Sequence, residues 1–187
     1  MKTVLALIFL VHTLVHGHHH HGHHDDHIGF FWEDYTENSL AHAVKGGTDE
    51  HDKITYIGQS KHVVDGKEVL IPGTIYPSDK SIYEWNTNSQ RVTKHFKILC
   101  TNYPDHMEWF STDTEKVKKL LHEIELIEGG VDEHHNKIYI GRIKANDNLL
   151  LGKVLITNDD HAGYYTTTET GDIHSTSFEI LSHVMRE

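Results

Sequence analysis

The chain contains very little cysteine and proline: one cysteine and three prolines among 187 residues. A single cysteine, Cys100, cannot form an internal disulfide, so packing alone must hold the fold together. It follows the apolar residues Ile98 and Leu99, which favours a buried small side chain over an intermolecular bridge. With so few prolines, the turns must depend on glycine, asparagine and aspartate.

No apolar run in the sequence is long enough to span a bilayer, so we expect no membrane span. Residues 1–17, MKTVLALIFLVHTLVHG, combine an early lysine, a short apolar run and small residues at the end. This pattern predicts a signal peptide and a secreted protein, and a short buried N-terminal helix is the alternative. The chain also lacks an N-x-[ST] sequon, so N-glycosylation is not expected.

Basic residues are fewer than acidic ones, and the formal net charge is -11 at pH 7 with the histidines neutral. This balance argues against nucleic acid or an anionic membrane as a partner. The chain has 20 histidines, so the charge moves towards neutral near pH 6. No nucleophile–base motif, glycine-rich phosphate loop or H-E-x-x-H sequence is present, so we do not expect an enzyme.

An internal repeat dominates the sequence. KGGTDEHDKITYIG (residues 45–58) and EGGVDEHHNKIYIG (residues 128–141) share Gly-Gly, Asp-Glu-His and Tyr-Ile-Gly in the same positions. Further along, LIPGTIY corresponds to LLLGKVL, and HFKIL corresponds to SFEIL, in the same order. We interpret these matches as a tandem duplication. The predicted organisation is a signal peptide (1–17), a histidine-rich disordered segment (18–29), a first repeat (30–104) and a second repeat (105–187).

Each repeat has the residue pattern of β structure. KITYIG and KIYIGRI mix β-branched and aromatic residues, while HFKIL and SFEIL place Phe and Ile on one face of a strand. The exception is STDTEKVKKLLHEIEL (residues 111–126), where Thr112 and Glu115 have capping-box spacing and an apolar stripe follows. We therefore expect an all-β fold of two tandem antiparallel repeats. A pseudo-twofold axis would relate the repeats within one compact body, with a short helix between them.

Both copies place Gly-Gly and one spacer before an aspartate, which is Asp49 in the first and Asp132 in the second. A glycine pair indicates either a bend with positive φ or a close approach of another backbone. The aspartate has two open interpretations. It can accept hydrogen bonds from the amides of its own turn, or it can recognise a polar ligand.

The motifs of the second copy, GGVDEHHNKIYIGR, LLLGKVL, GYYTTTETGD and FEIL, resemble the DM-nine repeat family in content and order. The resemblance covers nearly everything from about residue 32 to residue 184. It implies a β-rich tandem fold found in secreted or cytosolic proteins, some of which are mannose-binding lectins that recognise microbial surfaces. It also implies that an aspartate and a lysine hold the sugar, since together they satisfy vicinal hydroxyls.

Carried onto this chain, the resemblance assigns Asp132 and Lys153 to the second copy. The first copy retains Asp49 but has Thr74 where the motif has lysine. Threonine can form hydrogen bonds but supplies no charge. We therefore expect one competent sugar site in the second copy and a degenerate one in the first.

The histidines suggest a different chemistry. If cleavage follows Gly17, a free amine with histidine in third position suits Cu(II) or Ni(II), and the mixed nitrogen and oxygen donors of the tract suit Zn(II). The expected metal ligands are His18, His19, His20, His21, His23 and His24. His51, His134 and His135 lie inside the repeated phrase, either as a second metal or pH-sensitive position or as exposed loop histidines.

These observations leave three hypotheses. The leading one is a secreted protein that binds mannose-type glycans on microbial surfaces and requires no cofactor. Its single-site affinity would be weak, so a homo-oligomer or a clustered glycan would supply avidity. The alternative is a secreted protein that binds divalent metals and uses the repeats as a scaffold. The third is a structural or secretion component that assembles through its strand edges.

Overall fold

A computed structural model describes residues 29–86, 88–145, 148–168 and 171–185. The first half contains β1 (Phe30–Asp34), η1 (Asn38–Ala41), β2 (Lys45–Thr48), β3 (Ile54–Val64), β4 (Lys67–Tyr76), β5 (Ser81–Asn86), β6 (Asn88–Val92) and β7 (Lys97–Thr101). The second half contains η2 (Pro104–His106), β8 (Met107–Asp113), α1 (Val117–Glu123), β9 (Glu125–Leu126), β10 (Glu128–Val131), β11 (Lys137–Ala145), β12 (Asn148–Leu155), β13 (Gly163–Thr168), β14 (Gly171–Ser175) and β15 (Ser177–His183).

The two halves repeat one set of strand pairings, all antiparallel. In the first half β7 pairs with β1 and β3, and in the second half β15 pairs with β8 and β11. The hairpins β3–β4 and β11–β12 also correspond, as do the β4–β5–β6 and β12–β13–β14 meanders. The expected all-β fold of two pseudo-symmetric repeats is confirmed, with β9 and α1 as additions in the second half.

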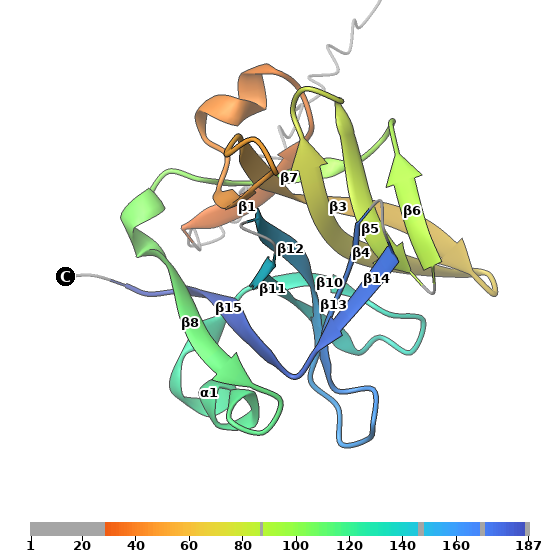
Figure 1. Cartoon of the computed structure of the whole chain (residues 1–187), viewed down its shortest axis with the longest axis vertical. Helices are drawn as coiled ribbons and strands as arrows, with labels where there is room; N and C mark the ends of the chain where they lie inside the picture. The colour runs from red at the N-terminus through yellow and green to blue at the C-terminus, as the bar shows by residue number, and fades with distance from the viewer. Residues whose placement is uncertain (1–28, 87, 146–147, 169–170, 186–187) are drawn as a thin grey trace, which may run out of the picture.

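The halves are joined by a closed ring of strands (Figure 1). From β3 the pairing runs through β2, β12, β11, β10 and β4 and returns to β3, so each half contributes three strands. The two junctions between halves are β2–β12 and β10–β4, each with one paired position. Because the ring closes, these inner strands leave no open edge along it.

The apolar residues that alternate along the strands meet in a core shared by both halves. One buried cluster combines Val44, Ile57 and Leu99 of the first half with Ile127, Ile140, Leu151 and Leu181 of the second. Full burial of such a side chain contributes roughly 1.5–3 kcal/mol. Each repeat thus covers the apolar face of the other, and Trp32 and Trp109 pack against this cluster from corresponding strands.

Helix α1 is shorter than residues 111–126, the stretch whose sequence predicted it. It begins at Val117, and its N-cap residue Lys116 has no side-chain capping bond. The expected capping box at Thr112 is wrong: Thr112 lies in β8, and its buried hydroxyl has no hydrogen-bond partner. The carboxylate of Asp113 instead accepts the backbone N–H groups of Glu115 and Lys116. Pairing of β8 with β15 along its whole length outweighs the local capping preference.

Cys100 is fully buried, as its apolar neighbours predict, and its thiol lies 3.1 Å from Oε1 of Glu33. Burial raises the pKa of this thiol to about 12. Such a group is a poor partner for disulfide exchange. Within the described part of the chain, no helix has both the length and the apolar character needed to cross a membrane.

Candidate functional site

The glycine pair of each copy lies where the backbones of the two halves meet. A methyl group on Gly130 of β10 would overlap the carbonyl oxygen of Leu70, and one on Gly47 of β2 would overlap that of Leu149. Neither glycine has a positive φ. Close approach of another backbone, the second of the two expectations, therefore explains the second glycine of each pair, whereas a methyl group on Gly46 or Gly129 would meet buried side chains.

Asp132 organises the turn that follows its glycine pair. Its Oδ1 accepts the backbone N–H groups of His134 at 2.8 Å and Asn136 at 2.7 Å, and the Asn136 amide donates to Oδ2 at 2.8 Å. Partial burial raises the pKa of this carboxyl, but the hydrogen bonds outweigh burial and the pKa is lowered. The aspartate is therefore ionised and fixed in position by its own turn.

Lys153 of β12 is a buried lysine. It is only 7% exposed, and its Nζ lies 4.4 Å from the ring centroid of Trp85 in β5 of the first half. Burial lowers the pKa of Lys153 to about 8, opposed by the negative charges of Glu84, Glu133 and Asp132. The charge of the predicted acid therefore acts on the predicted amine, but more weakly than the charges of Glu84 and Glu133 do.

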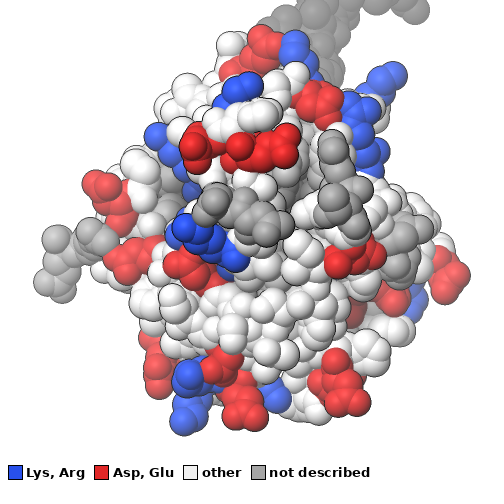
Figure 2. Space-filling model, in the orientation of Figure 1, with Lys and Arg blue, Asp and Glu red and all other residues white. Residues whose placement is uncertain are grey.

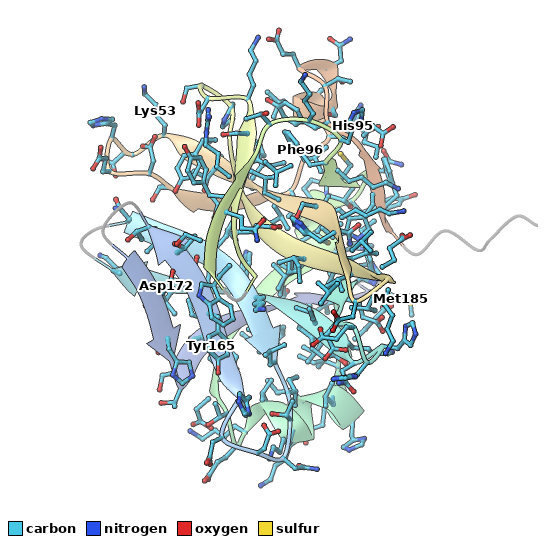
Figure 3. All side chains as sticks on the ribbon, turned by 90° about the vertical axis from the view of Figure 1, so that its right-hand side faces the viewer. Lys53, His95, Phe96, Tyr165, Asp172 and Met185 are labelled. Atoms are coloured by element: carbon cyan, nitrogen blue, oxygen red, sulfur yellow. The ribbon has the colours of Figure 1, made fainter. Side chains whose placement is uncertain are left out.

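An aromatic stack lies beside this lysine. Trp85 stacks on Tyr165 with centroids 4.9 Å apart, and Tyr165 stacks on His174 at 4.5 Å. Tyr165 and Asp172, from β13 and β14, are labelled on the same side of the molecule in Figure 3. Since Trp85 comes from the first half and Lys153 from the second, the site is composite.

A buried polar cluster surrounds Glu84, the residue that precedes Trp85 in β5. Glu84 is 2% exposed, and its carboxylate contacts the Ser60 hydroxyl and Nε2 of His62. Burial raises the pKa of Glu84 to about 8, although the charge of Lys153 opposes this, and burial lowers the pKa of His62. The three groups do not form a catalytic triad, because serine and carboxylate meet the same ring nitrogen of His62.

A groove of about 600 Å³ lies at the turn of the first copy. Its lining includes Asp49, Glu50, His51, Tyr76, Asp79, Tyr83, Asn148, Leu150, Thr167 and Ile173. In the register of the two meanders, Thr167 of β13 corresponds to Trp85 of β5. The small side chain of Thr167 lines the groove at the first copy, whereas the larger indole of Trp85 lies beside Lys153 of the second copy. Thr74 is 5% exposed, and its hydroxyl donates to the Leu151 carbonyl at 3.3 Å.

A family model described as the DM9 repeat matches residues 63–171, more than half of the chain. The chain belongs to the DM9 repeat family. Among solved structures, the crystal structure of the nematode sperm cell motility protein MFP2B is similar, with a TM-score of 0.51 and 12% identity. That match covers 83% of this chain and 46% of the other, and at this identity it shows the fold alone. No curated protein matches the sequence.

In this DM9 chain the structure brings together more residues than the repeated motifs predict. Asp132 and Lys153 lie within electrostatic reach, whereas Asp49 lines the groove with Tyr83. Sequence reasoning missed the contributions of Trp85 and Glu84. The sequence around Trp85 and Glu84 gives no sign of this role, because both residues lie in the first half while the motif that contains Lys153 lies in the second half.

The predicted metal ligands His18, His19, His20, His21, His23 and His24 lie outside the described residues, so the tract remains a prediction. Within residues 29–86, 88–145, 148–168 and 171–185, no group of three or more metal-binding side chains is placed to hold a metal ion. His51 and His134 are exposed and each lies beside a neighbouring glutamate. This geometry favours their interpretation as loop histidines.

The surface charge is mixed. On the face shown in Figure 2, described acidic side chains form several separate groups with basic ones between them. No continuous basic band crosses the described surface on that face.

Proposed function

We propose that this DM9 chain binds mannose-type glycans through Asp132 and Lys153. The observation that carries the proposal is the position of the Lys153 ammonium, over Trp85 and within reach of the Asp132 charge. An ionised carboxylate and an ammonium can together accept from and donate to neighbouring sugar hydroxyls. Both side chains are held in place before a ligand arrives, which lowers the entropy lost on binding.

The aromatic stack supports the same proposal. Apolar faces of sugar rings pack on the faces of exposed aromatic rings, and Trp85 and Tyr165 are partly exposed beside Lys153. We further propose that the protein is secreted and recognises microbial surfaces. Few apolar contacts accompany the polar ones, so each site would be weak, and oligomers or clustered glycans would supply avidity.

Changing Asp132 or Lys153 should weaken retention on mannan. We expect Lys153→Ala and Asp132→Asn each to weaken binding roughly tenfold or more, since a hydrogen bond to a charged group is worth about 1.5–3 kcal/mol. Asparagine preserves an acceptor oxygen for the turn while removing the charge. The measurement is affinity for soluble mannan by calorimetry, supported by a glycan array with and without chelator.

The exposed Lys61→Ala serves as the matched control, and it should bind as the wild type does. Asp49→Asn makes the same change in the first copy, where no lysine is present. We expect this variant to retain binding, and equal losses at Asp49 and Asp132 would point to two sites. A wild-type protein that ignores every glycan on the array would refute the proposal.

Glycan binding should also weaken as the pH rises through about 8. The pKa of Lys153 is lowered to about 8 from 10.5, so the ammonium loses its proton in a range where an ordinary lysine keeps it. Lys153→Arg should extend binding to higher pH, because arginine stays protonated. A wild-type affinity that is constant from pH 7 to pH 9.5 would contradict this role for the ammonium.

A further inference from the structure

His183, at the end of β15, is a buried histidine with one unpaired ring nitrogen. Its side chain is 6% exposed, and its Nδ1 lies 2.9 Å from Oε2 of Glu125 in β9. Its Nε2 is buried without a hydrogen-bond partner. Buried polar atoms in folded proteins are almost always satisfied, so this nitrogen calls for an explanation.

The contact with Glu125 determines which nitrogen is free. When Nδ1 donates its proton to the carboxylate, Nε2 presents an unshared electron pair, which is the form of imidazole that binds metals. A carboxylate that orients a histidine in this way is the usual partner of a metal ligand. The contact is held by the backbone, because His183 pairs with Glu125 across β15 and β9.

A second imidazole is close by. The rings of His106 and His183 have centroids 5.7 Å apart and are tilted by 49°. Two imidazoles bound at about 2.0–2.1 Å to one tetrahedral metal have centroids about 5 Å apart, so a small ring movement is sufficient. The backbone N–H of Val184 donates to the His106 carbonyl at 2.8 Å, which holds the two segments together.

Only glycine fits beside the unpaired nitrogen. A Cβ on residue 29 would lie 2.9 Å from Nε2 of His183, which is closer than a carbon atom approaches without displacement, so any larger residue would occupy the position that this nitrogen faces. The same position is 3.3 Å from Cδ2 of Tyr103, whose ring stacks on His106.

We propose that His183 and His106 form a binding site for a divalent transition metal, with Glu125 orienting His183. The donors are neutral imidazoles, which suit Zn(II), Cu(II) and Ni(II) better than Ca(II) or Mg(II). The site uses none of the residues assigned to glycan binding and does not depend on that function. It differs from a site in the histidine-rich tract because its ligands exist only in the folded protein.

Thermal unfolding of the full chain with Zn(II) distinguishes the two kinds of site. Metal held by the tract alone binds the folded and unfolded chain alike and leaves Tm unchanged, whereas metal at His183 and His106 raises Tm. We expect wild type to gain roughly 5 °C at saturating Zn(II), reversed by chelator. His183→Gln and His106→Gln should each lose the shift, and Glu125→Gln should need about tenfold more Zn(II).

His161→Gln is the matched control, because His161 also lies beside a carboxylate, 3.4 Å from Asp159, but is exposed. This variant should keep the full shift. His106 is only half-buried, so its variant remains informative if His183→Gln fails to fold. The proposal is overturned if Zn(II) leaves the wild-type Tm unchanged, or if the shift persists in His106→Gln.

Discussion

Gly130→Ala should lower the free energy of unfolding by about 3 kcal/mol or more. The new methyl group would overlap the carbonyl oxygen of Leu70, which belongs to β4 in the other half of the molecule. A backbone carbonyl cannot rotate away as a side chain can. The β10–β4 junction would therefore have to open, and this junction is one of the two that join the halves.

Gly66→Ala provides the control for this prediction. Gly66 has a φ of +77°, but nothing lies within 4 Å of the position of a new Cβ. Only backbone strain applies, and the expected cost is about 1–2 kcal/mol. Urea unfolding followed by circular dichroism measures both variants. Equal losses at Gly66 and Gly130 would show that the contact between halves is not what requires glycine.

Glu84→Gln should remove a pH dependence of stability of the order of 5 kcal/mol, since one pKa unit corresponds to about 1.4 kcal/mol. Burial raises the pKa of Glu84 from 4.5 to about 8 in the folded protein. Between these values the folded chain retains a proton that the unfolded chain has released. The preference of the folded chain for protonated Glu84 therefore contributes its full stabilisation below pH 4.5, and this stabilisation is lost as the pH rises through about 8.

Glutamine has nearly the same shape as protonated glutamate and does not titrate, so the variant should lack this slope. Lys153 acts in a separate window, because its lowered pKa makes stability rise with pH between about 8 and 10.5. Urea unfolding at several pH values from 5 to 8 gives the comparison, with the exposed Glu68→Gln as control. Parallel curves for wild type and Glu84→Gln would contradict the buried titration.

Much of the fold could be predicted because its signals are local. The repeated Gly-Gly-x-Asp phrase indicated the duplication, and the alternation in HFKIL and SFEIL indicated strands with one buried face. The aspartates build the turns that short-range chemistry predicts, with the same backbone bonds in both copies. Asp132 and Lys153 could be proposed because the family motif places both in one repeat.

The prediction of a capping box at Thr112 failed because a long-range contact, and not a local one, determines the structure there. Thr112 and Glu115 have the spacing of a capping box, yet Thr112 belongs to a strand that pairs with β15. Long-range pairing supplies several backbone hydrogen bonds, while a cap supplies about 1 kcal/mol. Thr112 pairs with Phe178, which lies more than sixty residues away in the sequence. A local sequence pattern cannot reveal a partner strand at that separation.

The sequence by itself determined the strands, the turns and the pair of repeats, since each depends on neighbours along the chain. Only the tertiary structure decided that Trp85 and Glu84 of the first half surround Lys153 of the second. It also decided that the open groove lies at the first copy, where Thr167 replaces the indole. The physical reason is the closed ring of strands, which places each half's meander against the other half's turn, a relation that no spacing within one repeat records.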